Sequence, residues 1–549
     1  MFVRSKTRAN GKISVQIVES YRIGAKVHQK IFRHIGQAET DWEVSELKAL
    51  AESIIKASSA NRQPSLPLFD PESMEHRLSG SVSNRPGTVD LGNLCEQQRI
   101  VEGIAQVFGR LYKELMLEDL ITGTKKDLAW NRIFRSCVLA RLANPASKRR
   151  TASILEADYG IKIPLDKIYR MMDHISKIEE KIKVRAGNAT RSLFPEPIDI
   201  LFFDVTTLYF ESMMADELRA NGYCKDAKFK EVNVVLALVT TTRGLPITYH
   251  LYPGKTYEGG TLPAVIQEMK KNFNVENVVV VADRAMFDEE NLALMDQEGI
   301  HYIVGARLKT LSAPKKNEIL SDLGYKVSVV SNELHWIKET EHKSRRLIVS
   351  YSSKRAKKDA IDRHKLVERL LKKAKDGKVA IKDLIPNHGS KKYITVTGEK
   401  CSVNDDKIQQ DSLWDGLHGV ITNLKTATAE SILARYRGLW QIEEAFRISK
   451  HDLRFRPIFH WTPKRIRAHI SICFVALTLA KQAVFRMERQ GHKMSFEVIR
   501  NELLHVQASI MKDMKNGARY AIPSHVTVNQ RKLYQVFGLK RQTTPFKID

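Results

Sequence analysis

The first 40 residues alternate polar and apolar side chains, which is the two-residue period of a strand with one buried face. The stretch "FVRSKTRANGKISVQIVESYRIGAKVHQKIFRHIG" is punctuated at Asn10-Gly11 and Ile23-Gly24, and the pattern predicts a three-stranded antiparallel meander. A short helix is expected near 41–57, so residues 1–57 are predicted to form an N-terminal β-rich subdomain. Residues 58–94 are rich in Ser, Pro, Gly and Asn and are interpreted as a linker.

Residues 95–192 change to apolar positions three and four apart, which predicts a helical region. The stretch "LAWNRIFRSCVLARLANPASKRRTASILEADYGI" predicts two helices separated at Asn144-Pro145. Three basic residues, Lys148, Arg149 and Arg150, follow that break. They either contact nucleic acid, which would make this a helical DNA-binding region, or form an ordinary solvated turn.

The pattern changes again from residue 193, where apolar runs typical of buried strands begin. Strands are predicted in "IDILFFDVTTLYF", "VNVVLALVTTT", "LPITYHLYP", "NVVVVADRAM" and "HYIVGARL", with helices in "LPAVIQEMKKNF" and "DEENLALMDQEG". The resulting order, β-β-β-α-β-α-β, predicts an α/β fold in which helices cover the faces of a mixed sheet. It is also the order of the ribonuclease H-like fold, so residues 193–309 are predicted to be the first part of such a core.

A β-rich insertion is predicted over residues 310–428, which also contain the long basic helix "SKRAKKDAIDRHKLVERLLKKAKDG". Residues 429–486 are predicted to complete the core with one helix over about 429–450 and another over 463–486. The apolar run "ISICFVALTLA" in the second helix is too short to span a bilayer and is interpreted as buried. Residues 487–549 are predicted to form a C-terminal helical tail.

The net charge of the chain indicates what kind of molecule the protein binds. Lys and Arg number 89 against 63 Asp and Glu, a formal net charge of +26 spread along the chain. Such an excess favours a polyanion, usually nucleic acid, over a merely basic soluble protein. The five cysteines form no CxxC pair, so neither a zinc site nor a disulfide framework is indicated. The N-terminus has no apolar signal segment, and the cytoplasm is the expected location, with no membrane association.

Two aspartates, Asp204 and Asp283, each follow an apolar strand-like run. A carboxylate in that position is costly unless it is solvated, paired or bound to metal, and strand ends in α/β sheets are where ligand sites form. Either residue alone is as well explained as a helix cap or turn former, whereas the two together favour a site. A haloacid dehalogenase-type phosphatase would need a second Asp two residues after the first, where this chain has Thr206. With a third acid from a helix, the pair could hold two Mg²⁺ ions and cleave a phosphodiester.

The segment "RYRGLWQIEEAFRISK", together with "GYCKDAKF", "VVADRAMFDEENL" and "DGLHGVITN", resembles the DDE transposases of bacterial insertion sequences. The resemblance is to the cut-and-paste group that has a Y-x2-R-x3-E-x6-K signature and an inserted β domain, within the ribonuclease H-like, retroviral integrase superfamily. It implies that Asp204, Asp283 and Glu443 are the catalytic, metal-binding triad. It also implies that Tyr436 and Lys450 are the signature tyrosine and lysine, which contact DNA.

Spacing distinguishes the two adjacent glutamates of this segment. Only Glu443 satisfies both Y-x6-E and E-x6-K, and spacings of seven put those three residues on one helical face. Glu444 is turned away by about 100° and is interpreted as structural. The signature arginine should fall at 439, where the chain has Leu439. Arg437 faces elsewhere on the helix, and Arg447, one turn beyond Glu443, is a candidate for the missing phosphate contact.

An aromatic residue in the β insertion stacks on a flipped base in relatives, and Trp336 and Trp414 are the candidates here, with core packing as the alternative for both. The resemblance implies a transposase that binds the terminal inverted repeats of its insertion sequence as double-stranded DNA. It would cleave and join DNA with two Mg²⁺ ions, or Mn²⁺ in their place. It would act as a homodimer on the DNA ends, in the bacterial cytoplasm near the nucleoid. Two alternatives stay open: a non-catalytic DNA-binding protein, which Leu439 favours, and a nuclease of the same fold that does not join ends.

Overall fold

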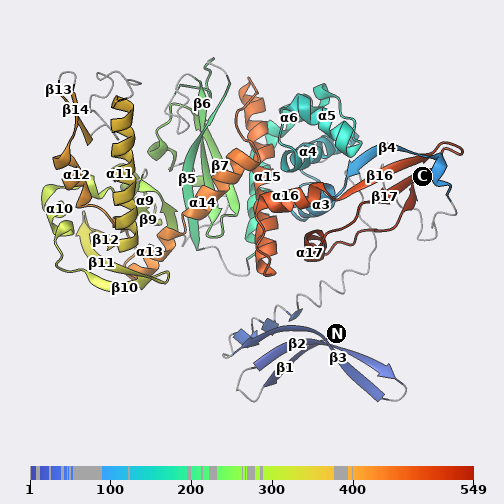
Figure 1. Ribbon diagram of the computed structural model, residues 1–549, viewed down its shortest axis with the longest axis horizontal. Coiled ribbons are helices and arrows are strands. Elements are labelled where there is room, and N and C mark those ends of the chain that lie inside the picture. The colour runs from blue at the N-terminus through green and yellow to red at the C-terminus, as the bar shows by residue number, and fades with distance from the viewer. Residues whose placement is uncertain are drawn as a thin grey trace.

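The structure is a computed structural model (Figure 1). It describes residues 2–7, 13–23, 26–38, 43–45, 47–48, 51–52, 89–121, 124–194, 199–211, 214–221, 231–262, 264–265, 267–268, 279–284, 288–375, 393–397 and 400–548. The phrase "GYCKDAKF", the two turns of the N-terminal meander and most of the predicted linker lie outside these residues.

The centre of the molecule is a mixed sheet in the order β10-β11-β12-β15-β9-β8-β5-β6-β7. Its core half consists of β5 (Ile200–Tyr209), β6 (Asn233–Thr241), β7 (Pro246–Pro253), β8 (Val279–Ala282) and β9 (His301–Gly305). The first three pair antiparallel, whereas β8 pairs parallel with β5, and β9 parallel with β8. If these five strands are numbered along the chain, their order across the sheet is 3-2-1-4-5, and the second strand is antiparallel to the first. This is the ribonuclease H-like arrangement that the sequence predicted.

The inserted segment extends the same sheet and does not form a separate one. Its strands are β10 (Lys326–Val330), β11 (Glu333–His342), β12 (Arg345–Tyr351) and β15 (Leu417–Thr422). Strand β15 pairs with both β12 and the core strand β9, so it joins the two halves. The remaining elements of this region are α10 (Ala313–Leu320), α11 (Ser353–Lys375), β13 (Ile394–Thr397), β14 (Lys400–Val403) and α12 (Asp405–Ser412).

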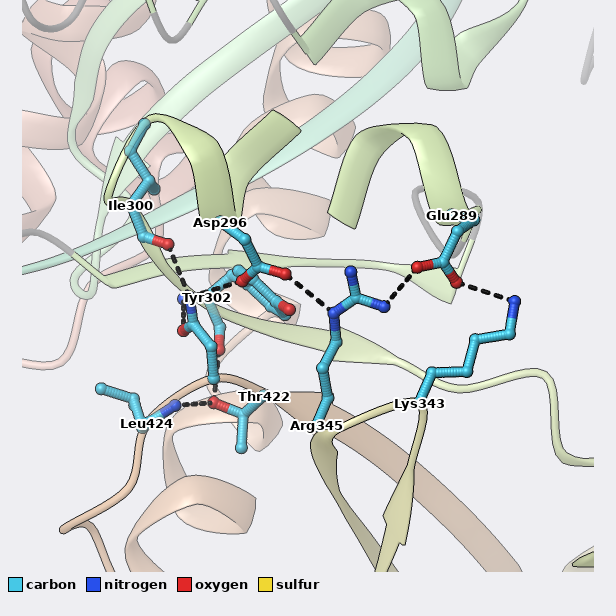
Figure 2. Close-up of polar contacts among 9 residues, drawn as sticks. Glu289, Asp296, Ile300, Tyr302, Lys343, Arg345, Thr422 and Leu424 are labelled. Atoms are coloured by element: carbon cyan, nitrogen blue, oxygen red, sulfur yellow. Dashed lines mark hydrogen bonds and ion pairs between the residues drawn. The ribbon is translucent and has the colours of Figure 1, made fainter. Parts of the chain in front are cut away.

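Polar contacts hold the insertion to the core helix α9 (Glu289–Gln297), as Figure 2 shows. Arg345 of β12 donates to Asp296 at 2.9 Å and to Glu289 at 2.6 Å, so one guanidinium spans two turns of α9. The side chain of Thr422 donates to the carbonyl of Tyr302 at 2.5 Å, beside the β15–β9 pairing. These bonds fix where the insertion stands relative to the strands that carry the candidate acids.

Helices cover the core sheet, and α15 (Pro463–Arg489) lies between the sheet and the other helices (Figure 1). Those helices are α3 (Gly103–Glu114), α4 (Lys125–Ala143), α5 (Lys148–Tyr159) and α6 (Leu165–Ile175), whereas α7 (Glu179–Arg191) packs directly on β7, where Thr190 donates to the Pro246 carbonyl at 3.0 Å. The break between α4 and α5 at Asn144-Pro145 was predicted. By length and composition α15 could cross a membrane, but its most apolar window is 89% buried inside the protein. It is therefore the buried helix expected from "ISICFVALTLA".

The region beginning at residue 95 is not helical throughout, because β4 (Leu94–Val101) precedes α3. Its partner is β16 (Gln507–Asp513), and β17 (Arg519–Pro523) and β18 (Phe546–Ile548) complete a four-stranded sheet. The predicted C-terminal helical tail is correct only for α16 (Phe496–Leu504) and α17 (Val528–Val536). The pairing of β4 with β16 joins segments some 400 residues apart, which no local periodicity reveals.

The N-terminal meander is present as predicted, with β1 (Phe2–Thr7), β2 (Ile13–Ile23) and β3 (Lys26–Ala38) pairing antiparallel. Val15 and Ile17 of β2 are buried against Val44 and Ala51, which belong to the helical residues described at 43–45, 47–48 and 51–52. The alternation of the sequence thus places one face of the meander on a small core of its own.

Candidate active site

Asp204 and Asp283 occupy equivalent positions relative to the neighbouring parallel strands β5 and β8. The parallel pairing of β5 with β8 ends at Phe203 and Ala282, and the next residues are Asp204 and Asp283. Asp204 was predicted to end its strand, but β5 continues to Tyr209 because its other edge pairs with β6. The side chain of Asp204 is half-buried and that of Asp283 is exposed, so both carboxylates stand at an accessible edge of the sheet.

The helix that carries the glutamates is interrupted. The predicted helix over 429–450 is α13 (Ala429–Arg437) followed by α14 (Trp440–Arg447) and a π-helical turn over Ile448–Asp452. Gly438 forms the joint: a Cβ at this position would overlap the Phe202 ring on β5. The absence of a side chain therefore lets the helix cross close to the strand that carries Asp204.

The three predicted metal ligands line one cavity of about 680 Å³. Asp204 and Asp283 come from the strands and Glu443 from α14, together with Tyr436 from α13. Their oxygen donors suit a hard cation such as Mg²⁺. Within the described residues, however, no three His, Cys, Asp or Glu side chains are gathered so as to hold a metal ion. The acids share a cavity but would have to converge to bind an ion together.

Tyr436 reaches the acids directly. Its hydroxyl donates to Asp283 Oδ1 at 3.4 Å, and its ring centroid is 4.9 Å from that of His418 on β15. Burial, and then the neighbouring Asp283 charge, raise the pKa of Tyr436 above its usual value, so the phenol stays protonated and remains a donor. Burial lowers the pKa of His418 to about 4, which leaves the imidazole neutral near pH 7. His418 lies in the phrase "DGLHGVITN" that carries the family resemblance, but it was not singled out as a site residue.

Gly305, the last residue of β9, is required for this arrangement. A Cβ there would overlap the Tyr436 hydroxyl and lie 3.0 Å from the Arg284 backbone nitrogen. We expect Gly305→Ala to displace Tyr436 and to lower DNA cleavage by roughly ten- to hundredfold, since misplacing a site group by about 1 Å can cost that much. Gly260→Ala is the control, because a Cβ at Gly260 meets nothing within 4 Å. Equal cleavage rates for the two variants would contradict the role of Gly305.

Glu444 points away from the cavity. Its carboxylate accepts from Lys481 Nζ at 3.0 Å, and the Lys481 side chain is only 3% exposed on α15. The adjacent Glu443 is exposed and lines the cavity. The two glutamates therefore take the different positions that the helical spacing predicted, with Glu444 joining α14 to the core helix.

The basic residues of the signature region are distributed differently from the sequence-based expectation. Leu439 is 8% exposed and packs in the main core at the edge of the cavity. Arg437 does line the cavity, but it donates to the Val330 carbonyl at 2.8 Å and to Glu333 at 3.1 Å. Arg447 lies 3.6 Å from Asp452. Among the described residues that line the cavity, neither Arg447 nor Lys450 appears.

The other predicted DNA contacts lie outside the cavity as well. Lys148 is 3% exposed, and burial lowers its pKa to about 8, so it does not stand on the surface as a DNA contact would. Arg149 and Arg150 are exposed in the first turn of α5, and both the DNA contact and the solvated alternative stay open for them. Trp336 is 37% exposed and packs edge-on against Tyr351 at 5.6 Å.

Side chains that the sequence analysis missed complete the cavity. One of them is Trp440, which is 56% exposed on α14 and lines the cavity three residues before Glu443. The earlier candidate Trp414 packs instead on the small core around Leu308. The inserted helix α11 adds a row of charged residues, which are Lys354, Arg355, Lys358, Asp359 and Asp362. In total, the described lining contains six carboxylates and four Lys or Arg side chains. Without bound cations, this cavity would repel a nucleic-acid phosphate.

Fold and cavity together define a ribonuclease H-like core whose candidate carboxylates line one cavity beside the sheet. A family model described as "Transposase DDE domain" matches residues 195–479, more than half of the 549 residues. The chain belongs to this family of DDE transposases. A second model, "IS1634 family transposase, N-terminal domain", matches residues 2–65, so this is a transposase of the bacterial insertion-sequence type. Domains of this family act on DNA and in general depend on metal ions.

Comparison with curated proteins gives no match. Among solved structures, the chain is similar to one described as a synaptic complex of piggyBac transposase with hairpin DNA, determined by cryo-electron microscopy. The sequence identity is 9% and the TM-score 0.40, over 73% of this chain and 76% of that chain.

Proposed function

We propose that this transposase binds the terminal inverted repeats of its own insertion sequence and cuts and joins DNA at the cavity described above. Three carboxylates far apart in the sequence, Asp204, Asp283 and Glu443, line that one cavity, and this observation carries the proposal. They would hold two Mg²⁺ ions, for which Mn²⁺ can substitute. Bound there, the ions would lower the pKa of water and stabilise charge on the leaving oxygen.

The side chains around the acids have separable tasks in this proposal. The Tyr436 hydroxyl, by donating to Asp283, would hold that carboxylate in one orientation. Arg437, held by Glu333 and Val330, would keep β10 and β11 against α13 beside the cavity. The exposed Arg149 and Arg150, with Arg447, Lys450 and Trp336, remain candidates for contacts with DNA away from the cleaved bond.

The reaction is two in-line displacements at phosphorus. Water first attacks the phosphodiester at the end of the element, and the P–O3′ bond breaks to leave a 3′-hydroxyl and a 5′-phosphate. That 3′-hydroxyl then attacks a phosphodiester of target DNA or of the opposite strand, forming a new P–O bond and releasing another 3′-hydroxyl. Two ends must be processed, which favours a homodimer on the DNA.

Removal of divalent metal provides a direct test. With EDTA we expect no cleavage of labelled inverted-repeat DNA, because six carboxylates against four cationic side chains leave the cavity unfavourable to phosphate. Added Mg²⁺ or Mn²⁺ should restore nicked product, and target DNA should then yield joined product. The absence of product under every metal condition would favour the non-catalytic alternative. Nicking without joined product would instead favour a nuclease.

A further inference from the structure

Helix α11 of the insertion forms one wall of the cavity. Lys358 follows Arg355 by three residues and Lys354 by four, so it lies on the same side of the helix as each of them, and all three line the cavity. Two contacts fix the helix in this position. The Arg363 guanidinium donates to both carboxylate oxygens of Asp415 at 2.5 and 2.6 Å, and Asp359 accepts from the Gly416 backbone N–H at 3.0 Å.

The cations that line the cavity differ in how far they are already engaged. Lys354 donates to Glu333 at 2.8 Å, and Arg437 donates to the same carboxylate at 3.1 Å. Arg355 is half exposed, and its nearest acid is Asp359 of its own helix at 3.7 Å. Lys358 is exposed and has no ion pair within the described part of the chain. Arg355 and Lys358 are therefore the two cations best able to receive an incoming anion.

Helix α14 lines the same cavity but does not supply this charge. Helix α14 and the residue before it present Leu439, Trp440 and Glu443 to the cavity, with no cation among them. The charge of Arg355 acts on His418, the histidine beside Tyr436. After burial, it is the next largest influence that lowers the pKa of His418. A DNA strand in the cavity would meet Glu443 and the Trp440 ring from α14, and from α11 the two cations together with two acids of the same helix.

We propose that Arg355 and Lys358 of the inserted helix bind the DNA phosphates next to the cleaved bond. The ligand class is the phosphodiester backbone, for which an exposed guanidinium and an ammonium are suited. This inference rests on the proposed function, since it assumes that DNA enters this cavity. It assigns the insertion a direct part in holding the substrate and supplies the cation that position 439 lacks.

The test compares two double variants of full-length protein on inverted-repeat duplex DNA. Arg355→Ala/Lys358→Ala removes both cavity cations, while Lys357→Ala/Lys365→Ala removes two exposed charges from the same helix that do not line the cavity. Alanine favours helix, so both should fold, and thermal melting checks this. We expect the first variant to bind roughly 10- to 100-fold more weakly at about 0.1 M salt, and its log–log salt slope to fall by about 2.

The control should keep the wild-type salt slope. The single variant Arg355→Lys should retain most of the affinity for DNA, because it keeps the positive charge at position 355. An unchanged slope in the cavity variant, or an equal loss in the control, would overturn the inference. Binding is measured without reference to cleavage. A wild-type protein that binds DNA but never cuts it would thus sink the proposed function while leaving the α11 comparison interpretable.

Discussion

Glu443→Gln is expected to lower DNA cleavage by on the order of 10³-fold while leaving the melting temperature unchanged. Glu443 is exposed in the cavity beside Asp204 and Asp283, so the amide occupies the same space but removes one negative ligand from the ions. Its side chain makes no ion pair within the described residues, so folding loses nothing by the change. Cleavage of end-labelled inverted-repeat DNA in Mg²⁺, measured in single-turnover conditions, provides the number.

Asp204→Asn and Asp283→Asn should show the same loss, because all three carboxylates serve the same ions. The matched control is Glu444→Gln, one residue away with the same chemical change. Cleavage by Glu443→Gln at the wild-type rate would rule out the assignment of the triad. A loss in Glu444→Gln alone, with a native melting temperature, would move the site by one residue.

Glu444→Gln is expected to have the opposite profile, with cleavage kept and stability reduced by about 1–3 kcal/mol. Its carboxylate is the partner of Lys481, whose side chain is 3% exposed, so the amide leaves a buried ammonium without a counter-charge. The partial exposure of Glu444 itself, 31% for the side chain, keeps the cost below that of a fully buried pair. Thermal unfolding of the wild-type protein and of Glu444→Gln, compared under the same conditions, measures the loss of stability.

A second substitution separates the ion pair from other causes. Lys481→Met in the Glu444→Gln background removes the unpaired charge and keeps a similar volume, so most of the lost stability should return. If the double variant melts as low as the single one, the loss comes from packing at position 444 or from its second ion pair, with Arg447 at 3.8 Å, and not from the charge of Lys481.

The candidate site could be predicted in part because its chemistry is local. Asp204 and Asp283 stood out as acids after apolar runs, and Glu443 was separated from Glu444 by spacing on one helix. The DNA contacts were harder to predict. Lys148 is expensive to bury and was expected outside, yet it is only 3% exposed at the start of α5. Arg355, Gly305 and His418 had no distinguishing pattern, because each matters only through what lies opposite it.

The sequence by itself determined the strands of the core and their order along the chain, and it supplied the proposal of which acids bind metal. Apolar periodicity and side-chain chemistry act over a few residues, and both can be read without coordinates. Only the tertiary structure decided that β4 pairs with β16, that β15 joins the insertion to β9, and that α11 and Glu443 line one cavity. Those contacts depend on which sheet edges and helix faces meet, and segments distant along the chain carry no local record of their partners.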